Sequence, residues 1–243
     1  MLEAASWGLV AGAALLIGAG VGLRFRLHQW VIALVMAFGV GALISAVAYE
    51  LTAEAYARGG ADSVLIGLTL GAGLFFAGDL AIDRRGGRHR KRSGGQQSDV
   101  GAAILLGAVL DGIPESIVIG ISLLEGGAVG LAFVVAVFVS NLPEGLSGAT
   151  GMRRAGHTPR AILLMWAIVC VASAAAAALG YGVAGDLPDH VVGVVQAFAA
   201  GGILTMLADT MMPEAFDEGG HRPWIGLVTI LGFGFGSWLQ VVA

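Results

Sequence analysis

Long apolar stretches dominate this sequence, and each is close to the length that a helix needs to cross a lipid bilayer. About 20 apolar residues span the hydrocarbon core as a helix. Lipid offers the backbone no hydrogen-bond partners, so such stretches are expected to be helical. The apolar stretches lie near residues 4–23, 30–52, 63–82, 101–123, 128–149, 160–183, 190–212 and 224–242. We therefore predict an all-α membrane protein, with residues 1–243 forming a single transmembrane domain of eight helices.

The composition agrees with a chain that mostly faces lipid or other helices. Hydrophobic residues make up 57% of the 243 and charged residues 12%, whereas soluble domains are typically about 25% charged. The 40 glycines suit helices that pack closely in lipid, because small residues let two backbones approach. The single cysteine, Cys170, excludes a disulfide or a thiolate metal site within one chain.

The basic residues indicate how the chain is oriented. Cytoplasmic loops are enriched in Lys and Arg, and with the N-terminus outside, only Arg58 falls on the outer side. The other twelve fall on the cytoplasmic side: Arg24, Arg26, Arg84, Arg85, Arg88, Arg90, Lys91, Arg92, Arg153, Arg154, Arg160 and Arg222. We predict extracytoplasmic N- and C-termini, a basic cytoplasmic loop at 83–99, and location in the plasma membrane.

Two of the predicted helices resemble each other. Residues 38–56 align with residues 198–216 without a gap, at an offset of 160. The predicted topology runs the first segment outward and the second inward, which is the arrangement of an inverted repeat. We therefore expect eight helices arranged as 3+2+3. The matched pairs are Phe38/Phe198, Gly41/Gly201, Ser45/Thr205, Ala48/Ala208, Glu54/Glu214 and Tyr56/Phe216.

Acidic and polar side chains interrupt the apolar character of two neighbouring helices. In 101–123, Asp111 and Glu115 are four residues apart and so project from one face of the helix. In 128–149, Ser140 and Asn141 precede Glu144 by one turn. These five side chains are the predicted metal-binding residues.

A proline directly precedes each of the two glutamates. Pro114 and Pro143 remove a backbone N–H and disturb the preceding turn. We expect a kink in both helices and backbone carbonyls, those of Leu110 and Val139, without their usual helical partner. Such carbonyls are tolerated in a membrane beside protein or a water-filled cavity.

Three carboxylates within the membrane require compensation. Each charged side chain at the bilayer centre costs about 2.5–3.5 kcal/mol, so three cost about 8–10 kcal/mol. Neither helix contains Lys, Arg or His, which leaves protons or a bound cation to neutralise the charge. Carboxylate, amide and hydroxyl oxygens suit a divalent cation. A proton relay, or protonated carboxylates that bond across packed helices, are the open alternatives.

The sequences Ile113-Pro-Glu115 and Asn141-Leu-Pro-Glu-Gly145 resemble the paired motifs of the ZIP (zinc–iron permease) metal transporters. The resemblance covers essentially the whole chain and implies uptake of divalent metal toward the cytoplasm. By position, Asp111 replaces the family's histidine, while Glu115 and Glu144 keep its two glutamates. Ser140 and Asn141 fall where the family offers polar ligands. The metal ion would be the transported substrate, and no prosthetic group is expected.

This sequence also departs from the family pattern. Gly112 stands where asparagine is common, and helix 160–183 contains no acidic residue. We therefore expect a second metal position to be absent or weakened. With no histidine inside a predicted helix of the transport site, manganese or iron becomes as credible as zinc.

Several assignments stay open at this point. Glu50, Glu54, Asp209 and Glu214 are either relay sites at the entrance and exit or solvated residues at helix ends. A degenerate ZIP-like protein with a regulatory or assembly role is the alternative to a transporter. An enzyme is not expected, because the His-Glu-x-x-His pattern of a metalloprotease is missing. The expected partners are divalent metal ions and the lipid bilayer, not nucleic acid, and a homodimer is an open option.

Overall fold

The computed structural model describes residues 1–25, 27–82, 100–124, 130–219 and 223–242. Helix is the regular structure throughout these ranges, so the prediction of an all-helical protein is confirmed. The elements are α1 (Leu2–Arg24), α2 (Gln29–Ala46), the π-helical segment η1 (Val47–Thr52), α3 (Ala53–Ile82), α4 (Val100–Ser122), α5 (Leu131–Arg154), α6 (Pro159–Ala184), α7 (Asp189–Met206), the π-helical segment η3 (Leu207–Met211), α8 (Met212–Gly219) and α9 (Trp224–Val242).

Most predicted helix ends agree with the structure to within a few residues. Among the exceptions, α5 continues to Arg154 beyond the predicted end at 149, and α3 begins at Ala53, well before the predicted start at 63. The helix predicted over 190–212 also continues, through η3 into α8. The predicted basic loop 83–99 lies outside the described residues.

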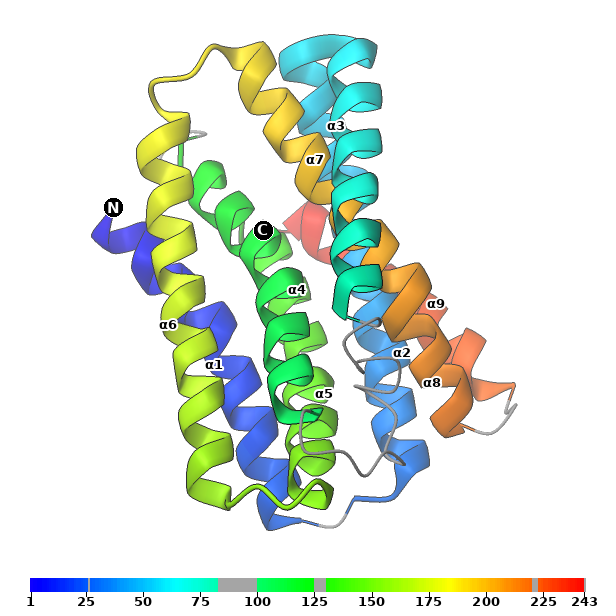
Figure 1. The fold of residues 1–243 in the computed structure, drawn as a ribbon. Coiled ribbons are helices and arrows are strands. Elements are labelled where there is room, and N and C mark those ends of the chain that lie inside the picture. Colours follow the sequence, from blue (N-terminus) through cyan, green and yellow to red (C-terminus); the bar gives the residue numbers. More distant parts are fainter. Residues whose placement is uncertain (26, 83–99, 125–129, 220–222, 243) are drawn as a thin grey trace.

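Seven helical stretches in the described ranges are long and apolar enough to cross a membrane. One of them, Gln29–Ile82, has 54 residues, far more than the roughly 20 that one crossing requires. Gly60 lies within it with φ 70° and ψ −172°. That left-handed φ is readily available only to glycine, and the chain leaves the helical path there. Figure 1 shows α3 descending beside α7 after this point.

The helices form a bundle with α4 and α5 near its centre (Figure 1). On one side, α1 packs against α5 and α6, and α6 also contacts α4. On the other side, α3 packs against α7, while α2 lies between α9 and α5. The two central helices therefore connect the two groups.

Basic residues gather at one end of this bundle. The α1–α2 and α5–α6 connections both lie at the lower end in Figure 1. Four of the five Lys and Arg residues in the described ranges belong to these connections or the helix ends beside them, namely Arg24, Arg153, Arg154 and Arg160. The fifth, Arg58, lies at the opposite end and forms an ion pair with Asp189 at 3.4 Å.

The two π-helical segments occupy corresponding positions in the aligned helices. Adding the offset of 160 to Val47, where η1 begins, gives Leu207, where η3 begins. Pro213 follows η3 closely, but its counterpart after η1 is Ala53. Because both segments form with only one proline present, proline alone does not explain the wider turn.

Glycines bring helix backbones together in matching pairs. A Cβ at Gly41 would lie 2.9 Å from the carbonyl carbon of Thr229, and a Cβ at Gly201 would lie 2.9 Å from that of Leu68. Between the same helices, a Cβ at Gly232 would lie 2.8 Å from the carbonyl carbon of Phe38, and a Cβ at Gly71 would lie 2.7 Å from that of Phe198. Residues of α2 therefore correspond to residues of α7 at an offset of 160 (41 to 201, 38 to 198). Residues of α3 correspond to residues of α9 at an offset of 161 (68 to 229, 71 to 232).

The remaining helices show the same correspondence. Between α1 and α5, a Cβ at Gly18 would lie 3.1 Å from the carbonyl carbon of Leu142, and a Cβ at Gly145 would lie 2.8 Å from that of Leu15. Between α6 and α4, Gly180 meets Ile117 at 3.0 Å and Gly120 meets Ala177 at 2.9 Å, again measured from the added Cβ to the carbonyl carbon. The corresponding residues of α1 and α6 in these contacts differ by 162 in number, and the corresponding residues of α4 and α5 differ by 25.

Candidate functional site

On α4, the two carboxylates lie between two apolar clusters of the core. Asp111 and Glu115 are 3% and 2% exposed. Ala108, one turn before them, belongs to a cluster that includes residues of α1, α5 and α6. Val118, one turn after them, belongs to the large cluster built around α2 and α7. The carboxylates are thus enclosed on both sides along the helix.

The same two apolar clusters enclose the polar residues of α5, in the reverse order along the chain. Ser140, Asn141 and Glu144 are buried, Val137 before them belongs to the large cluster, and Ala149 after them belongs to the other. The two helices run in opposite directions (Figure 1). Their polar segments therefore lie at one level of the bundle, and we call this level the polar layer, defined by Asp111, Glu115, Ser140, Asn141 and Glu144.

Two members of the polar layer donate hydrogen bonds to helix backbones. The Ser140 hydroxyl donates to the carbonyl oxygen of Val137 at 2.9 Å, within α5. The Asn141 amide donates to the carbonyl oxygen of Ala11 at 3.2 Å, which ties α5 to α1. A cation is bound through oxygen lone pairs, which these donated bonds do not use. Both side chains can therefore hold the helices and still offer an oxygen ligand.

The carboxylates of the polar layer do not form a compact cluster. Within the described ranges, no three His, Cys, Asp or Glu side chains gather closely enough to form a metal-ligand group. The described histidines, His28, His157 and His190, lie at helix ends or in a connection. Any cation in this layer would therefore be bound by a mixture of carboxylate and neutral oxygens.

Pro114 and Pro143 lie inside α4 and α5, and both helices continue past them. Close to the first proline, the Ser116 hydroxyl donates to the carbonyl oxygen of Gly112 at 2.7 Å. The nearest atom to a Cβ at Gly112 would be the Ser173 hydroxyl oxygen of α6, at 3.7 Å. Helix α6 thus brings a hydroxyl toward α4, although it contains no acidic residue.

Glu214, one of the candidate exit residues, is joined to α5. It is 5% exposed and accepts a hydrogen bond from the Ser147 hydroxyl. Ser147 lies three residues after Glu144, on the same face of α5. Half-buried Ser147 and buried Glu214 therefore continue the series of side-chain oxygens from the polar layer toward the basic end of the bundle. Asp209, in η3, is exposed.

The two candidate entrance residues are held by glutamines. The Gln240 amide donates to Glu50 at 2.7 Å, and the Gln196 amide donates to Glu54 at 2.8 Å. Glu50 is buried and its carboxylate approaches Gly130, directly before α5. A buried carboxylate, Glu50, and a half-buried one, Glu54, thus also lie beyond the polar layer on the side opposite the basic end.

The sequence alone did not indicate Ser147, Gln196 or Gln240 as parts of this arrangement. Ser147 lies seven residues after Ser140, a spacing that places both on one helix face and could have identified it. The glutamines meet their partners across more than 140 residues of chain, and no local pattern indicates such pairs.

A comparison with known protein families matches most of the chain. Residues 78–242, which include the polar layer and α4 to α9, match the family model described as ZIP Zinc transporter. The match covers 165 of the 243 residues (242 − 78 + 1). No curated protein matches the chain.

Proposed function

Because the chain belongs to the ZIP zinc transporter family, whose members transport divalent metal ions, we propose that it carries such ions through the polar layer toward the cytoplasm. The matched residues include both helices that form this layer. Zinc, manganese and iron are the candidate substrates. The ion is the transported substrate and not a resident cofactor.

The burial of Asp111, Glu115 and Glu144 in the middle of two central helices is the observation that carries the proposal. All three are at most 8% exposed. Holding three ionised carboxylates at this depth costs about 8–10 kcal/mol on the lenient insertion scale. A divalent cation that enters the layer offsets this cost, because it supplies opposite charge in a medium of low dielectric constant.

The proposed ligands are Asp111, Glu115, Ser140, Asn141 and Glu144. This set combines carboxylate, hydroxyl and amide oxygens, so it does not need three carboxylates at one point. All-oxygen ligation favours a harder cation than the imidazole and thiolate sites typical of zinc. Manganese or iron is therefore as reasonable a substrate as zinc.

Carboxylates on either side of the polar layer suggest a route through the protein. Glu50 and Glu54 would receive the cation on the outer side, and Glu214 with Ser147 would pass it on toward the basic end. Four described arginines at that end support its assignment to the cytoplasmic side, by the positive-inside tendency. The proposed direction is therefore from Glu50 toward Glu214.

We also propose eight membrane crossings in an inverted 3+2+3 repeat, with both termini outside. The departure from helical geometry at Gly60 supports two crossings within Gln29–Ile82. The aligned π-helical segments and the four pairs of matching glycine contacts support the repeat. Location in the plasma membrane and a homodimer stay predictions.

Metal uptake into proteoliposomes tests the proposed site. We expect Glu115→Gln and Glu144→Gln each to lower the initial rate at least about tenfold, since loss of even an outer partner of a metal ligand typically costs 10–100-fold. Asp62→Asn is the control, because Asp62 is an exposed carboxylate far along the chain from the layer. Wild-type rates in both glutamate variants would refute the site.

A non-transporting role is the second candidate. It is favoured by the finding that, among the described residues, no three His, Cys, Asp or Glu side chains form a metal-ligand group. The two candidates differ in whether the purified protein binds metal. A ligand at 100 times its dissociation constant stabilises the folded state by about 2.7 kcal/mol, so a transporter should melt at a higher temperature with its metal present. No uptake together with no stabilisation by zinc, manganese or iron would favour the second candidate.

A further inference from the structure

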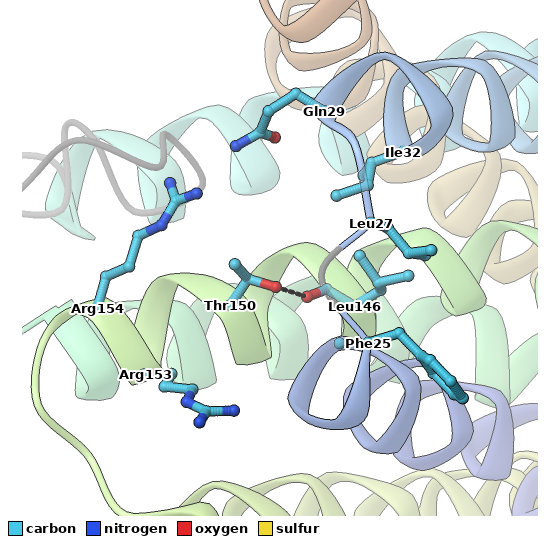
Figure 2. Close-up of a pocket in the computed structure, with 9 residues that line it drawn as sticks. Phe25, Leu27, Gln29, Ile32, Leu146, Thr150, Arg153 and Arg154 are labelled. Carbon is cyan, nitrogen blue, oxygen red and sulfur yellow. Dashed lines mark hydrogen bonds between the residues drawn. The ribbon is translucent and has the colours of Figure 1, made fainter.

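A cavity of about 360 Å³ opens at the basic end of the bundle, between α1, α2 and α5. Figure 2 shows its walls. Arg153 and Arg154, at the end of α5, line one side, and the apolar side chains of Phe25, Leu27 and Ile32 line another. No carboxylate is among the described residues that line it. The cavity is therefore positive on one side and apolar on the other.

The two arginines are presented by the same helix end but reach in different directions (Figure 2). The Arg153 guanidinium donates to the carbonyl oxygen of Leu23 at 2.7 Å, which fixes the end of α5 to the end of α1. A guanidinium has five N–H donors, so one such bond leaves it able to bind an anion. Cations at a helix C-terminus also interact favourably with the helix dipole.

The surroundings of the cavity indicate that it lies where lipid head groups meet water. Trp30, beside the lining residue Gln29, is 42% exposed at the start of α2, and tryptophan is enriched at membrane interfaces. Arg24 lies at the same end, 5.6 Å from the centre of the Phe25 ring. A ligand that fits here must have an anionic group next to an apolar part.

We propose that this cavity binds the phosphate group of an anionic phospholipid through Arg153 and Arg154, with the adjoining apolar part of the lipid against Phe25, Leu27 and Ile32. Basic pockets between membrane helices on the cytoplasmic side bind anionic head groups in this way. The transported cation is not a suitable occupant, because two positive charges face the cavity. The site is thus separate from the proposed metal route.

Titration of the full-length protein in detergent with phosphatidylglycerol or phosphatidylcholine of identical chains tests this proposal, with the bound fraction measured by native mass spectrometry. An arginine near the head groups strengthens the binding of an anionic lipid about fivefold. We therefore expect the Arg153→Gln/Arg154→Gln variant to bind phosphatidylglycerol about 30-fold more weakly and phosphatidylcholine as before.

Arg160→Gln is the matched control, because Arg160 lies in the first turn of α6, which begins at the same end of the bundle (Figure 1), but does not line the cavity. Equal binding of both lipids by the wild type, or an equal loss in Arg160→Gln, would overturn the proposal. Full displacement of phosphatidylglycerol by inorganic phosphate would overturn the lipid assignment in favour of a soluble anion.

A second substitution covers the case in which the double variant does not fold. Leu27 lies in the α1–α2 connection and is 40% exposed, so replacing it should not disturb the core. Leu27→Glu places a negative charge at the cavity wall and should weaken phosphatidylglycerol binding severalfold relative to Leu27→Gln. Equal binding by these two variants would also contradict the proposal.

Discussion

Two pairs of glycines, each pair spaced two residues apart on one helix, allow a sharp test of how the helices pack. In α3, a Cβ at Gly71 would lie 2.7 Å from the carbonyl carbon of Phe198, whereas a Cβ at Gly73 would meet nothing within 4 Å. In α9, Gly232 would meet Phe38 at 2.8 Å, and Gly234 would again meet nothing. Each close glycine thus has a matched control on its own helix.

Gly71→Ala and Gly232→Ala should destabilise the protein relative to Gly73→Ala and Gly234→Ala. Ordinary contact begins near 3.4 Å, so the helices must separate by at least 0.6–0.7 Å (3.4 − 2.8 and 3.4 − 2.7). The obstructing atoms are backbone and cannot rotate away. Overpacking of this kind typically costs about 1–3 kcal/mol. Alanine also gains helix propensity over glycine, but this gain is common to both members of a pair and cancels.

Thermal unfolding in detergent, followed by intrinsic fluorescence, measures the difference. For a chain of this size, about 1–3 kcal/mol corresponds to a melting temperature lower by about 2–12 °C. Because the α2–α9 and α3–α7 contacts correspond under the proposed repeat, both pairs should show differences of similar size. Indistinguishable melting within each pair would refute the packing argument, and a difference in one pair alone would refute the proposed symmetry.

Substitutions at three further positions test individual contacts by the same unfolding assay. Ser147→Ala removes the hydroxyl that donates to buried Glu214 and should lower the free energy of unfolding by about 1–3 kcal/mol. Ser147→Thr keeps a hydroxyl and should lower it less. Equal stability of the two variants would argue against this hydrogen bond. Gln196→Met removes the amide that donates to Glu54 at 2.8 Å and should cost a similar amount, so an unchanged melting temperature would contradict its structural role. Arg58→Ala breaks the exposed ion pair with Asp189 and should change stability by at most about 1 kcal/mol; a larger loss would show that Arg58 does more than pair at the surface.

Some positions of polar residues could be predicted from the chain and others could not. The carboxylates Asp111, Glu115 and Glu144 stand out because each interrupts a long apolar stretch, and burial follows from membrane energetics alone. The role of Asn141 is different, since its amide bonds to Ala11 in a helix 130 residues away. The ion pair of Asp189 with Arg58 is likewise decided by the fold, because the two residues lie 131 positions apart in the chain.

The sequence by itself determined that the chain is helical and membrane-embedded, that acidic residues lie within two neighbouring helices, and that residues 38–56 correspond to 198–216. These properties depend on length, hydropathy and spacing, which are read along the chain. Only the tertiary structure decided that the polar residues of α4 and α5 share one level between two apolar clusters, which glycines meet a facing backbone, and that Glu214 reaches Ser147. It also formed the arginine-lined cavity from three helix ends. Such contacts join residues far apart in sequence, so they arise only when the helices pack.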